Sequence, residues 1–525
     1  MQNLTIIMLR SRAMMSTATA AVADATTAEI NTAMAAAAAA FPIYSTAPPK
    51  QVAHLLESAA SEIEQLGETL IHTAVSETGL LDTRIQGETV RTTGQLRQFA
   101  QLVTEGSWVD ARLDVGGGTG RDIRRMLQPL GPATIFGASN FPLAFSVAGG
   151  DTAAALAARC PVVHKAHPGH PMTCDLIAGA LKRAVYDSDL PVGVFSMVHG
   201  SAPRVGQELV AHPVSKVGGF TGSLQAGRAL YDVACSRPVP IPFYAEMGSV
   251  NPVIILPGAL GSKWESIASG LAGSVTMGAG QFCTNPGLVF TVNPSHDATM
   301  VSKFVKEVAR AVDRIPPSKM LTENIGNEYV KKLTTLSNAA QGSVDFFTSR
   351  EISVGGGAVL HVCGDTYLQH SHELQEEVFG PATLIVEFDT VDALLSAVDM
   401  LEGQLTTTVW GSSDDLRTAG KIGGLLQKLS NIAGRVLFNG FPTGVEVCSS
   451  MVHGGPYPAS TIDETSVGTE AIRRFVRPVC FQDCPDKLLP TELRDANKFG
   501  IFRKVNGTFT RDSVKVDEYF QKQVV

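Results

Sequence analysis

The stretch Val217-Gly218-Gly219-Phe220-Thr221-Gly222-Ser223 decides the fold of this chain. It passes from a short β-rich run, through a glycine turn, into a helix-like segment at 223–235. Other short β-rich runs alternate with helix-like segments on both sides of it, and they lie at 133–137, 162–165, 192–196 and 243–246. Strand–helix alternation at this spacing is typical of parallel βαβ units, so the sequence predicts an α/β fold.

The alternation continues beyond this region. A second alternating region extends from 251 to about 440, with β-rich runs at 253–256, 288–292, 383–388 and 406–410. Residues 51–104 have apolar side chains at three- and four-residue steps, which predicts helices. Residues 105–131 are glycine-rich and then basic, with Arg121, Arg124 and Arg125. The tail from 481 mixes polar and apolar residues, and we expect it to be an arm that packs on a partner subunit.

Composition excludes several classes of protein. The chain has 525 residues, a net charge of −8, 18% charged residues and 44% hydrophobic residues. Long disorder needs low hydrophobicity and high charge, so it is not expected. A mildly acidic chain without a Lys/Arg block is not expected to bind nucleic acid. No apolar run reaches the ~18 residues of a membrane span, so no membrane partner is expected either.

The cysteines and the N-terminus bear on the compartment. Eight cysteines without a framework spacing fit a reducing compartment, and we expect a cytoplasmic protein. Residues 1–23 are rich in Ser, Thr and Ala and carry Arg10 and Arg12, a weak resemblance to a mitochondrial presequence. The alternative interpretation, which we favour, is a disordered start.

Polar residues follow the predicted strands of the first region. Ligands bind a doubly wound sheet at the carboxyl ends of its strands. The residues at these ends are Asn140, Lys165, Thr221-Gly222-Ser223 and Glu246. The usual dinucleotide fingerprint, G-x-G-x-x-G, is absent from all of them.

Three residues are candidates for chemistry, and each has an ordinary structural alternative. Cys283, in Gly280-Gln281-Phe282-Cys283-Thr284, has small and polar neighbours that a ligand can reach, although a lone cysteine is more often inert. Glu246 ends an apolar run, where burial would raise its pKa and suit a general base, or it pairs with a lysine. The Asn140 amide could donate to an oxyanion, or Asn140 is a turn residue.

Six motifs in one order resemble the aldehyde dehydrogenase superfamily. They are an Asn-Phe-Pro segment at Asn140, a Lys after a Val-Val strand at Lys165, Phe220 to Ser223, Glu246 to Gly248, Gly280 to Cys283, and Glu377 to Pro381. The resemblance covers about 45 to 500. It implies a Rossmann-like cofactor domain, an α/β catalytic domain and a small oligomerisation element, assembled as a homodimer or homotetramer.

The resemblance also implies roles for the residues. The Cys283 thiolate would add to an aldehyde, Asn140 and the Cys283 backbone N–H would hold the oxyanion, and Glu246 would activate water to hydrolyse a thioester. The cofactor would be NADP or NAD. Lys165 would bind its adenosine ribose, Ser223 its pyrophosphate and Glu377 its nicotinamide ribose. Phe379 would pack near the nicotinamide ring, and the other residues beside the cofactor would be Thr221, Gly222 and Gly248. No metal is expected.

Further segments resemble one branch of the superfamily. They include Glu77 to Leu80, Phe136 to Phe145, Lys165 to Pro168, Pro442 to Val447 and Met451 to Pro458. That branch contains 2-oxoglutarate semialdehyde (2,5-dioxopentanoate) dehydrogenases, and a relative is the NADP-dependent fatty aldehyde dehydrogenase of luminous bacteria. A broad or fatty aldehyde substrate therefore stays open. Outside oxidoreductases, Cys283 and Glu246 would also suit a thioester hydrolase or acyltransferase.

Two departures from the superfamily pattern carry predictions. The carboxylate that usually follows the lysine and binds the ribose 2′-hydroxyl is absent from Lys165-Ala166-His167-Pro168, so we expect NADP to be accepted and preferred. His164 and His167 would add positive charge there if protonated. The second departure is His453, which either assists proton transfer or is a hydrogen-bonded loop residue.

Several residues are candidates for binding the substrate away from its aldehyde group. Candidates for binding a substrate carboxylate are Arg121, Arg124, Ser449 and Ser450. Phe145, Phe441 and Val447 could line either a pocket for this substrate or an apolar tunnel for a fatty aldehyde.

We expect an N-terminal extension at 1–23, a cofactor-binding domain at 24–245, a catalytic domain at 246–455 and a C-terminal segment with oligomerisation contacts at 456–525.

Overall fold

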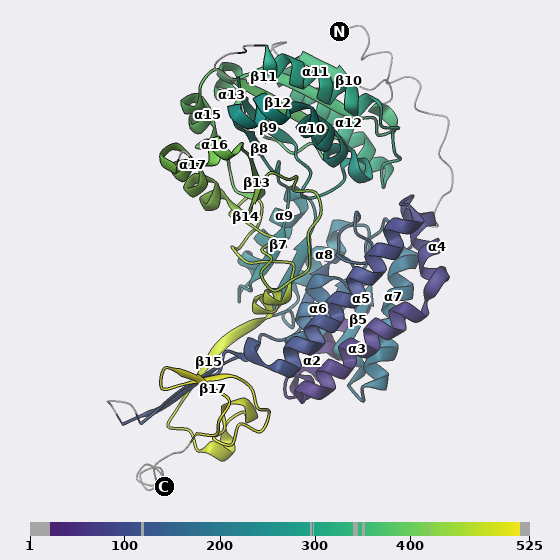
Figure 1. Ribbon diagram of the computed structural model, residues 1–525. Helices are drawn as coiled ribbons and strands as arrows, with labels where there is room; N and C mark the ends of the chain where they lie inside the picture. Colours follow the sequence, from purple (N-terminus) through teal and green to yellow (C-terminus); the bar gives the residue numbers. More distant parts are fainter. Residues whose placement is uncertain are drawn as a thin grey trace.

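The computed structural model describes residues 22–116, 120–293, 297, 299–339, 345–348, 352–417 and 419–514. The predicted N-terminal extension at 1–23 lies outside these residues except for its last two. Figure 1 shows two lobes and a smaller arm that projects away from them. Each of the three contains one β-sheet.

Helices form the start of the described chain, as predicted for 51–104. They are α2 (Thr27–Tyr44), α3 (Pro49–Gln65), α4 (Gly67–Thr78) and α5 (Asp82–Glu105). The reciprocal capping box of Thr26 and Glu29 begins α2, and Gly106 ends α5 with a φ of 81°. The buried faces of α3 and α5 belong to one core with the first sheet.

The first sheet is entirely parallel and has the order β5-β4-β3-β6-β7. Its strands are β3 (Ala133–Phe136), β4 (Val162–Lys165), β5 (Phe195–Val198), β6 (Val217–Thr221) and β7 (Phe243–Glu246), and its helices are α6 (Gly150–Ala157), α7 (Pro171–Asp187), α8 (Pro203–Ala211) and α9 (Leu224–Ser236). The predicted run at 192–196 begins too early, because Val192–Val194 is a 3-10 turn. The order of strands reverses at β3, so the crevice between β3 and β6 is the switch point where such sheets bind ligands.

The second sheet forms the other lobe (Figure 1) and has the order β10-β11-β12-β9-β8-β13-β14. Only the edge strand β10 is antiparallel among its described pairings. Its strands are β8 (Val253–Ile255), β9 (Leu288–Val292), β10 (Asp345–Thr348), β11 (Ala358–Cys363), β12 (Ala382–Phe388), β13 (Gln404–Trp410) and β14 (Ala433–Phe438). The helices around it include α10 (Pro257–Thr276), α11 (Met300–Asp313), α12 (Glu323–Ala339), α13 (Gly364–Gln369), α14 (Ser371–Leu374), α15 (Val391–Val398), α16 (Ser413–Arg417) and α17 (Ala419–Ile432).

The arm contains a third sheet that the sequence did not predict. Its order is β15-β2-β1-β16-β17, from β1 (Arg112–Val115), β2 (Asp122–Pro129), β15 (Val476–Gln482), β16 (Arg503–Val505) and β17 (Thr508–Thr510). The basic residues of this segment form ion pairs, Arg124 with the distant Asp495 and Arg125 with Asp110.

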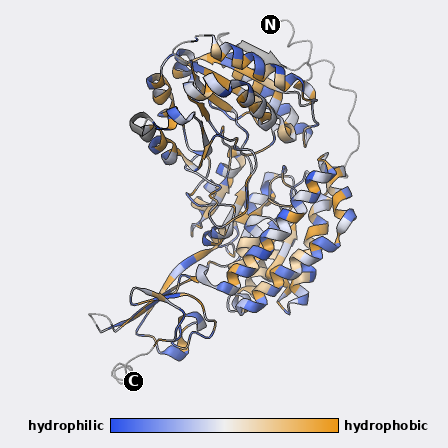
Figure 2. Ribbon diagram, viewed as in Figure 1, coloured by the Kyte–Doolittle hydropathy of each residue, from blue (hydrophilic) through white to orange (hydrophobic). Residues whose placement is uncertain are grey.

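Buried apolar residues form the cores of both lobes. Figure 2 shows hydrophobic and hydrophilic residues alternating along many of the helices that cover them. None of the helices in the described ranges is long and apolar enough to cross a membrane.

Candidate active site

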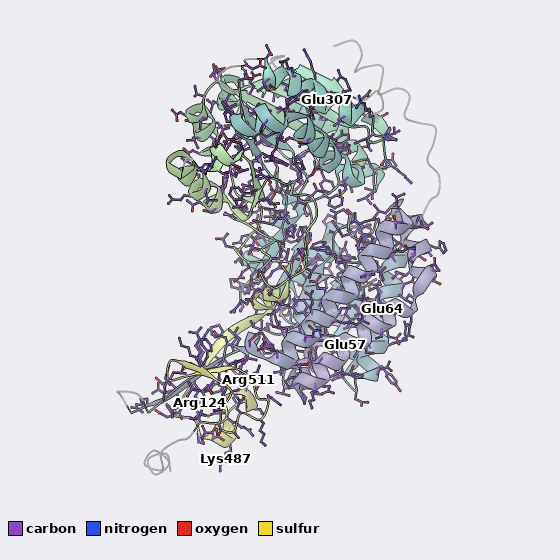
Figure 3. All side chains as sticks on the ribbon, viewed as in Figure 1. Glu57, Glu64, Arg124, Glu307, Lys487 and Arg511 are labelled. Carbon is purple, nitrogen blue, oxygen red and sulfur yellow. The ribbon has the colours of Figure 1, made fainter. Side chains whose placement is uncertain are left out.

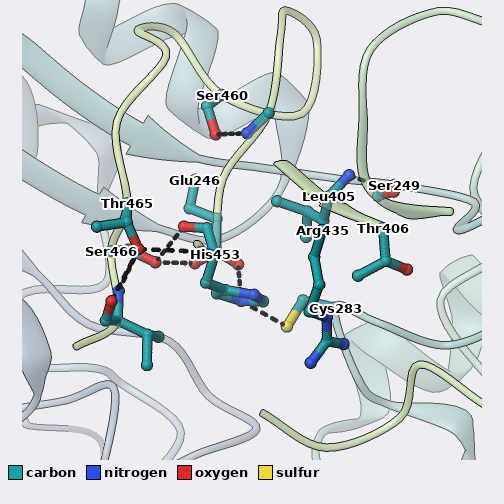
Figure 4. A network of polar contacts seen from close by, with 12 residues as sticks. Glu246, Ser249, Cys283, Leu405, Thr406, Arg435, His453, Ser460, Thr465 and Ser466 are labelled. Carbon is teal, nitrogen blue, oxygen red and sulfur yellow. Dashed lines mark hydrogen bonds and ion pairs between the residues drawn. The ribbon is translucent and has the colours of Figure 1, made fainter. Parts of the chain in front are cut away.

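Three titratable side chains from distant parts of the chain meet between the lobes (Figure 4). Glu246 is the last residue of β7, Cys283 lies in the loop between a 3-10 turn (Met277–Gly280) and β9, and His453 lies in the segment after β14. Glu246 and His453 are fully buried, and Cys283 is partly exposed. The sequence had marked all three, but their proximity is a result of tertiary structure.

His453 lies between the other two residues. Its Nε2 is 3.4 Å from Cys283 Sγ and 3.1 Å from Glu246 Oε1. Ser466 Oγ donates a 2.6 Å hydrogen bond to Glu246 Oε2. A single ring nitrogen can therefore exchange a proton with the thiol or with the carboxylate. The three ligand atoms lie within 4.8 Å of one another, a spacing that a metal ion could also use.

Burial affects the two ionisable partners of His453 differently. Burial and the nearby carboxylates Glu246 and Glu377 raise the pKa of Cys283 well above its ordinary value. Burial alone would also raise the pKa of Glu246, but His453, the Ser466 hydrogen bond and Arg474 outweigh it. The pKa of Glu246 is therefore lowered, and the predicted rise was wrong. At neutral pH the site contains a thiol and a carboxylate.

The loop that carries Cys283 is held by close backbone contacts. Gly280 has a φ of +64°, and a Cβ there would lie 2.2 Å from the carbonyl carbon of Gly380. The buried amide of Asn251 donates to the carbonyl oxygens of Cys283 at 2.8 Å and Asn285 at 2.9 Å. Asn251 was not among the site residues predicted from the sequence. The Asn-Pro pair at Asn251-Pro252 signals a turn, but it does not indicate the turn's partner.

Asn140 follows β3 and faces the same loop. Its Nδ2 donates a 3.0 Å hydrogen bond to the carbonyl oxygen of Gln281, two residues before Cys283. The structure therefore brings Asn140 to the cysteine loop, with its amide bonded to backbone.

The predicted pyrophosphate site lies at the switch point of the first sheet. Thr221 ends β6, and Ser223 caps α9 by accepting a hydrogen bond from the Ala226 N–H at 3.3 Å. The Gly222 N–H donates to the carbonyl oxygen of Glu246 at 3.1 Å, so this turn is tied to the end of β7. The N-terminus of a helix attracts anions through its free N–H groups and its dipole.

Gly248 and Glu377 are in close contact across the site. A Cβ at position 248 would lie 2.4 Å from Glu377 Oε2, so this carboxylate needs a glycine opposite it. Burial raises the pKa of Glu377 to about 7, against the opposing charge of Lys332. Glu377 and Phe379 line a pocket together with Ser249, Gly280 and Phe282.

Lys165 ends β4 beside a group of histidines. Burial lowers the pKa of the Lys165 ammonium. Burial also lowers the pKa of His164 to about 3, and that of His167 well below its usual value. Both rings are therefore neutral at physiological pH, and the condition for their adding positive charge, protonation, is not met. His164 contacts Thr152, and His167 accepts from the Gly169 N–H.

Both arginines that were predicted to bind the substrate carboxylate lie in the arm, away from the site. Arg121 pairs with Asp483, and Arg124 is buried in the arm (Figure 3) beside Asp122 and Asp495. They do not line the site, and that prediction was wrong. Ser449 and Ser450 are exposed, Phe441 packs on Trp410, and Phe145 lies 6.0 Å from the His453 ring between centroids.

Arginines that the sequence analysis missed are near the site instead. Arg91, on α5, lies over the rings of Phe141 and Phe145 at 5.7 and 5.0 Å. Arg435, on β14, lies beside Cys283 in Figure 4. Arg91 belongs to a helix whose sequence shows only an amphipathic pattern, so no local signal distinguished it from a surface residue.

The chain belongs to the aldehyde dehydrogenase family, whose pattern it matches over residues 7–478. Among its relatives, it is 44% identical to an alpha-ketoglutaric semialdehyde dehydrogenase of Acinetobacter baylyi, over 93% of each chain. It is also 44% identical to alpha-ketoglutaric semialdehyde dehydrogenase 2 of Azospirillum brasilense, over 91% of each chain.

Solved structures share the fold at lower identity. A methylmalonate-semialdehyde dehydrogenase from Oceanimonas doudoroffii has a TM-score of 0.73 at 19% identity, covering 87% of this chain and 91% of that one. A 1-pyrroline-5-carboxylate dehydrogenase from Thermus with bound NAD has a TM-score of 0.73 at 19% identity, covering 88% and 86%. The predicted α/β fold, with Rossmann-like and catalytic domains, is confirmed, and the protein is an NAD(P)-dependent aldehyde dehydrogenase.

Proposed function

We propose that this enzyme oxidises 2-oxoglutarate semialdehyde to 2-oxoglutarate, with NADP as the preferred cofactor. The observation that carries the substrate is the 44% identity, over nearly the whole chain, to alpha-ketoglutaric semialdehyde dehydrogenases of two bacteria. A homodimer or homotetramer and a cytoplasmic location, with a mitochondrial one as the alternative, remain predictions.

The first half of the reaction begins with a neutral thiol. His453 takes the proton of Cys283 and is stabilised as a cation by the Glu246 carboxylate at 3.1 Å. The thiolate then adds to the aldehyde carbon to form a thiohemiacetal. The Asn140 amide and the Cys283 backbone N–H stabilise the oxyanion, for which Asn140 must exchange its bond to Gln281.

The residues present fit a dinucleotide. Gly248 leaves room for the Glu377 carboxylate, and the N-terminus of α9 opens at the switch point of the sheet. Lys165 and Glu377 would hold the two riboses, Thr221, Gly222 and Ser223 the pyrophosphate, and Phe379 and Gly248 the nicotinamide. When bound, the nicotinamide supplies an acceptor for hydride.

The second half of the reaction is hydrolysis of the Cys283 thioester. Glu246 is ionised because its pKa is lowered, so it can accept a proton from the attacking water. Ser466 orients the carboxylate through the 2.6 Å hydrogen bond to Oε2. The alternative of a cysteine-dependent thioester hydrolase uses the same two residues, but the family of the chain favours the dehydrogenase.

The substrate proposal is tested by NADPH formation. We expect 2-oxoglutarate semialdehyde to have a higher kcat/KM than aliphatic aldehydes of six to twelve carbons, and Cys283→Ala to abolish turnover. Preference for a long-chain aldehyde would favour the fatty aldehyde alternative. Turnover without Cys283 would exclude the thioester mechanism.

The cofactor proposal is tested at Pro168, which is exposed where the superfamily often has a carboxylate. Pro168→Glu should raise the KM for NADP by about tenfold or more, because a carboxylate repels the 2′-phosphate, and should leave the KM for NAD nearly unchanged. Pro168→Gln is the matched control without charge. A wild-type KM for NADP equal to or above that for NAD would contradict the proposed preference.

A further inference from the structure

The guanidinium of Arg91 packs on the rings of Phe141 and Phe145 but has no hydrogen-bond or salt-bridge partner within the described part of the chain. It is half-buried, its Nε has no hydrogen-bond acceptor, and none of its nitrogens forms a hydrogen bond or a salt bridge with a described residue. The charge of Glu88, one turn earlier on α5, acts on Arg91 only from a distance, because its Oε2 pairs with Arg84 at 3.4 Å and its Oε1 accepts from the N–H groups of Leu143 and Ala144. A half-buried cation without a hydrogen-bond acceptor is costly, so this guanidinium is suited to bind an anionic ligand.

Arg91 is connected to the reacting cysteine through two aromatic contacts. Its guanidinium lies 5.0 Å from the centre of the Phe145 ring, and that ring lies 6.0 Å from the ring of His453. His453 Nε2 is 3.4 Å from Cys283 Sγ. The positive charge of Arg91 also lowers the pKa of Cys283, against the larger effect of burial. Arg91 therefore faces the same space as the thiol.

Arg435 presents a second donor to this space from the other lobe. Its two terminal nitrogens donate to the carbonyl oxygens of Gly444 at 3.0 Å and Pro442 at 2.6 Å, which fixes the guanidinium. Its Nε is buried without a hydrogen-bond partner in the described ranges. Figure 4 shows this side chain alongside Cys283.

We propose that Arg91 binds the carboxylate of the substrate and that the Nε of Arg435 donates to the neighbouring 2-oxo oxygen. This assignment rests on the proposed function. A guanidinium can bind a carboxylate through two parallel hydrogen bonds, whereas both terminal nitrogens of Arg435 already donate to backbone and only its Nε lacks an acceptor, which suits one carbonyl oxygen. The aromatic rings of Phe141 and Phe145 then enclose the two methylene groups, with the aldehyde carbon at Cys283. Arg91 selects the anionic end of the substrate.

The test compares a charged and an uncharged five-carbon aldehyde. Arg91→Gln should raise the KM for 2-oxoglutarate semialdehyde by about 30-fold or more, as expected for losing a charge-assisted hydrogen-bonded pair, and should leave the KM for pentanal unchanged or lower. Arg91→Lys, which keeps the charge, should recover part of this loss. Arg435→Gln should raise the KM for the oxo acid less than Arg91→Gln does.

A matched control variant and a binding measurement separate carboxylate binding from a general effect on the helix or on turnover. Arg97→Gln changes an arginine on the same helix that pairs with Glu64 instead, and it should behave as wild type. Titration calorimetry with 2-oxoglutarate should show the same loss of affinity in Arg91→Gln without any turnover. An equal effect on both aldehydes, or none on either, would overturn the assignment.

The experiments can contradict the proposed substrate without contradicting the role of Arg91 in binding a carboxylate, and the reverse. If the wild type prefers succinate semialdehyde, a shorter anionic aldehyde, and Arg91→Gln removes that preference, the substrate proposal is wrong and the carboxylate site stands. If the wild type prefers 2-oxoglutarate semialdehyde and Arg91→Gln keeps the preference, the substrate proposal stands and the carboxylate site is wrong.

Discussion

His453 gives this site a proton acceptor in direct contact with the nucleophile. The raised pKa of Cys283 means that few molecules carry a thiolate at neutral pH, so addition to an aldehyde needs a base. His453 is buried, lies within reach of both Cys283 and Glu246, and has Nδ1 without a hydrogen-bond partner among the described residues. Nε2 is therefore placed to receive the proton of the thiol.

Replacing His453 by Asn should lower kcat by about 100-fold, the lower range for losing a general base. The KM for the cofactor should change little. Alkylation of Cys283 by iodoacetamide, followed from pH 6 to 10, supplies a readout that a purely structural role would not move. The rate should rise with pH in the wild type and be slower at neutral pH in the variant. Unchanged turnover would mean that His453 is an ordinary loop residue.

Glu377 should make stability depend on pH. Its pKa is about 7 in the folded state against an ordinary value of 4.5, so the unfolded chain loses this proton first as pH rises. Stability from this group is therefore full below about pH 4.5 and falls until about pH 7. Glu377→Gln should be more stable than the wild type at pH 8, by about 1–3 kcal/mol, and equal to it at pH 4.5. Urea denaturation of both proteins at the two pH values, without cofactor, tests the sign.

At the scale of elements, the turn before Cys283 decides where the nucleophile lies. α10 ends at Thr276, and the chain then takes positive φ values at Gly278, Ala279 and Gly280 before the cysteine. This conformation places Gly280 against the backbone of Gly380, the same segment that carries Glu377. One glycine contact therefore links the cysteine loop to the predicted ribose ligand.

The Gly280→Ala variant should lose most of the enzyme's activity but remain folded. The new Cβ would overlap the Gly380 backbone and would require a left-handed φ, so the loop must move. We expect kcat to fall by about 100-fold, because small displacements of a reacting group cost this much. Gly273→Ala is the control on α10, where a Cβ meets no atom within 4 Å. It should keep activity and add about 0.5–1 kcal/mol of stability. Equal activity of the two variants would contradict the expectation.

At the scale of the whole molecule, the arm joins two segments far apart in sequence. β2 pairs with β15, and β1 pairs with β16, so strands from the two segments form one sheet. Arg124 holds them together by donating to Asp122 and to the carbonyl oxygen of Leu493, and by pairing with Asp495. We propose that this arm carries the oligomerisation contacts predicted for 456–525, and that it includes 112–129 as well.

Replacing Arg124 by Leu should destabilise the arm by about 1–3 kcal/mol, because the carbonyl oxygen of Leu493 and the half-buried Asp122 and Asp495 lose their buried partner. Oligomers built through the arm should then dissociate, and sedimentation should show a lower mass. Arg121→Leu is the control, because that side chain is exposed in its pair with Asp483. An unchanged mass for Arg124→Leu, with the arm shown to be unfolded by proteolysis, would exclude the arm as the contact.

The sequence predicted regular elements well where local pattern and burial agree. Val162–Lys165 and Phe243–Glu246 were predicted to the residue, because parallel strands buried on both faces show as short apolar runs. β2 was missed, because its charged residues hide the strand pattern and the buried Arg124 pairs with Asp495, 371 positions later in the chain. The limits of the domains stay a prediction.

The sequence by itself determined the α/β class and the identity of Cys283, Glu246, Asn140 and Lys165 as candidate residues, because motifs and strand ends are local features. Only the tertiary structure decided that His453 touches both Cys283 and Glu246, that the pKa of Glu246 is lowered, and that Arg91 replaces Arg124 as the arginine near the site. The physical reason is that distance, burial and pairing depend on groups that are far apart along the chain.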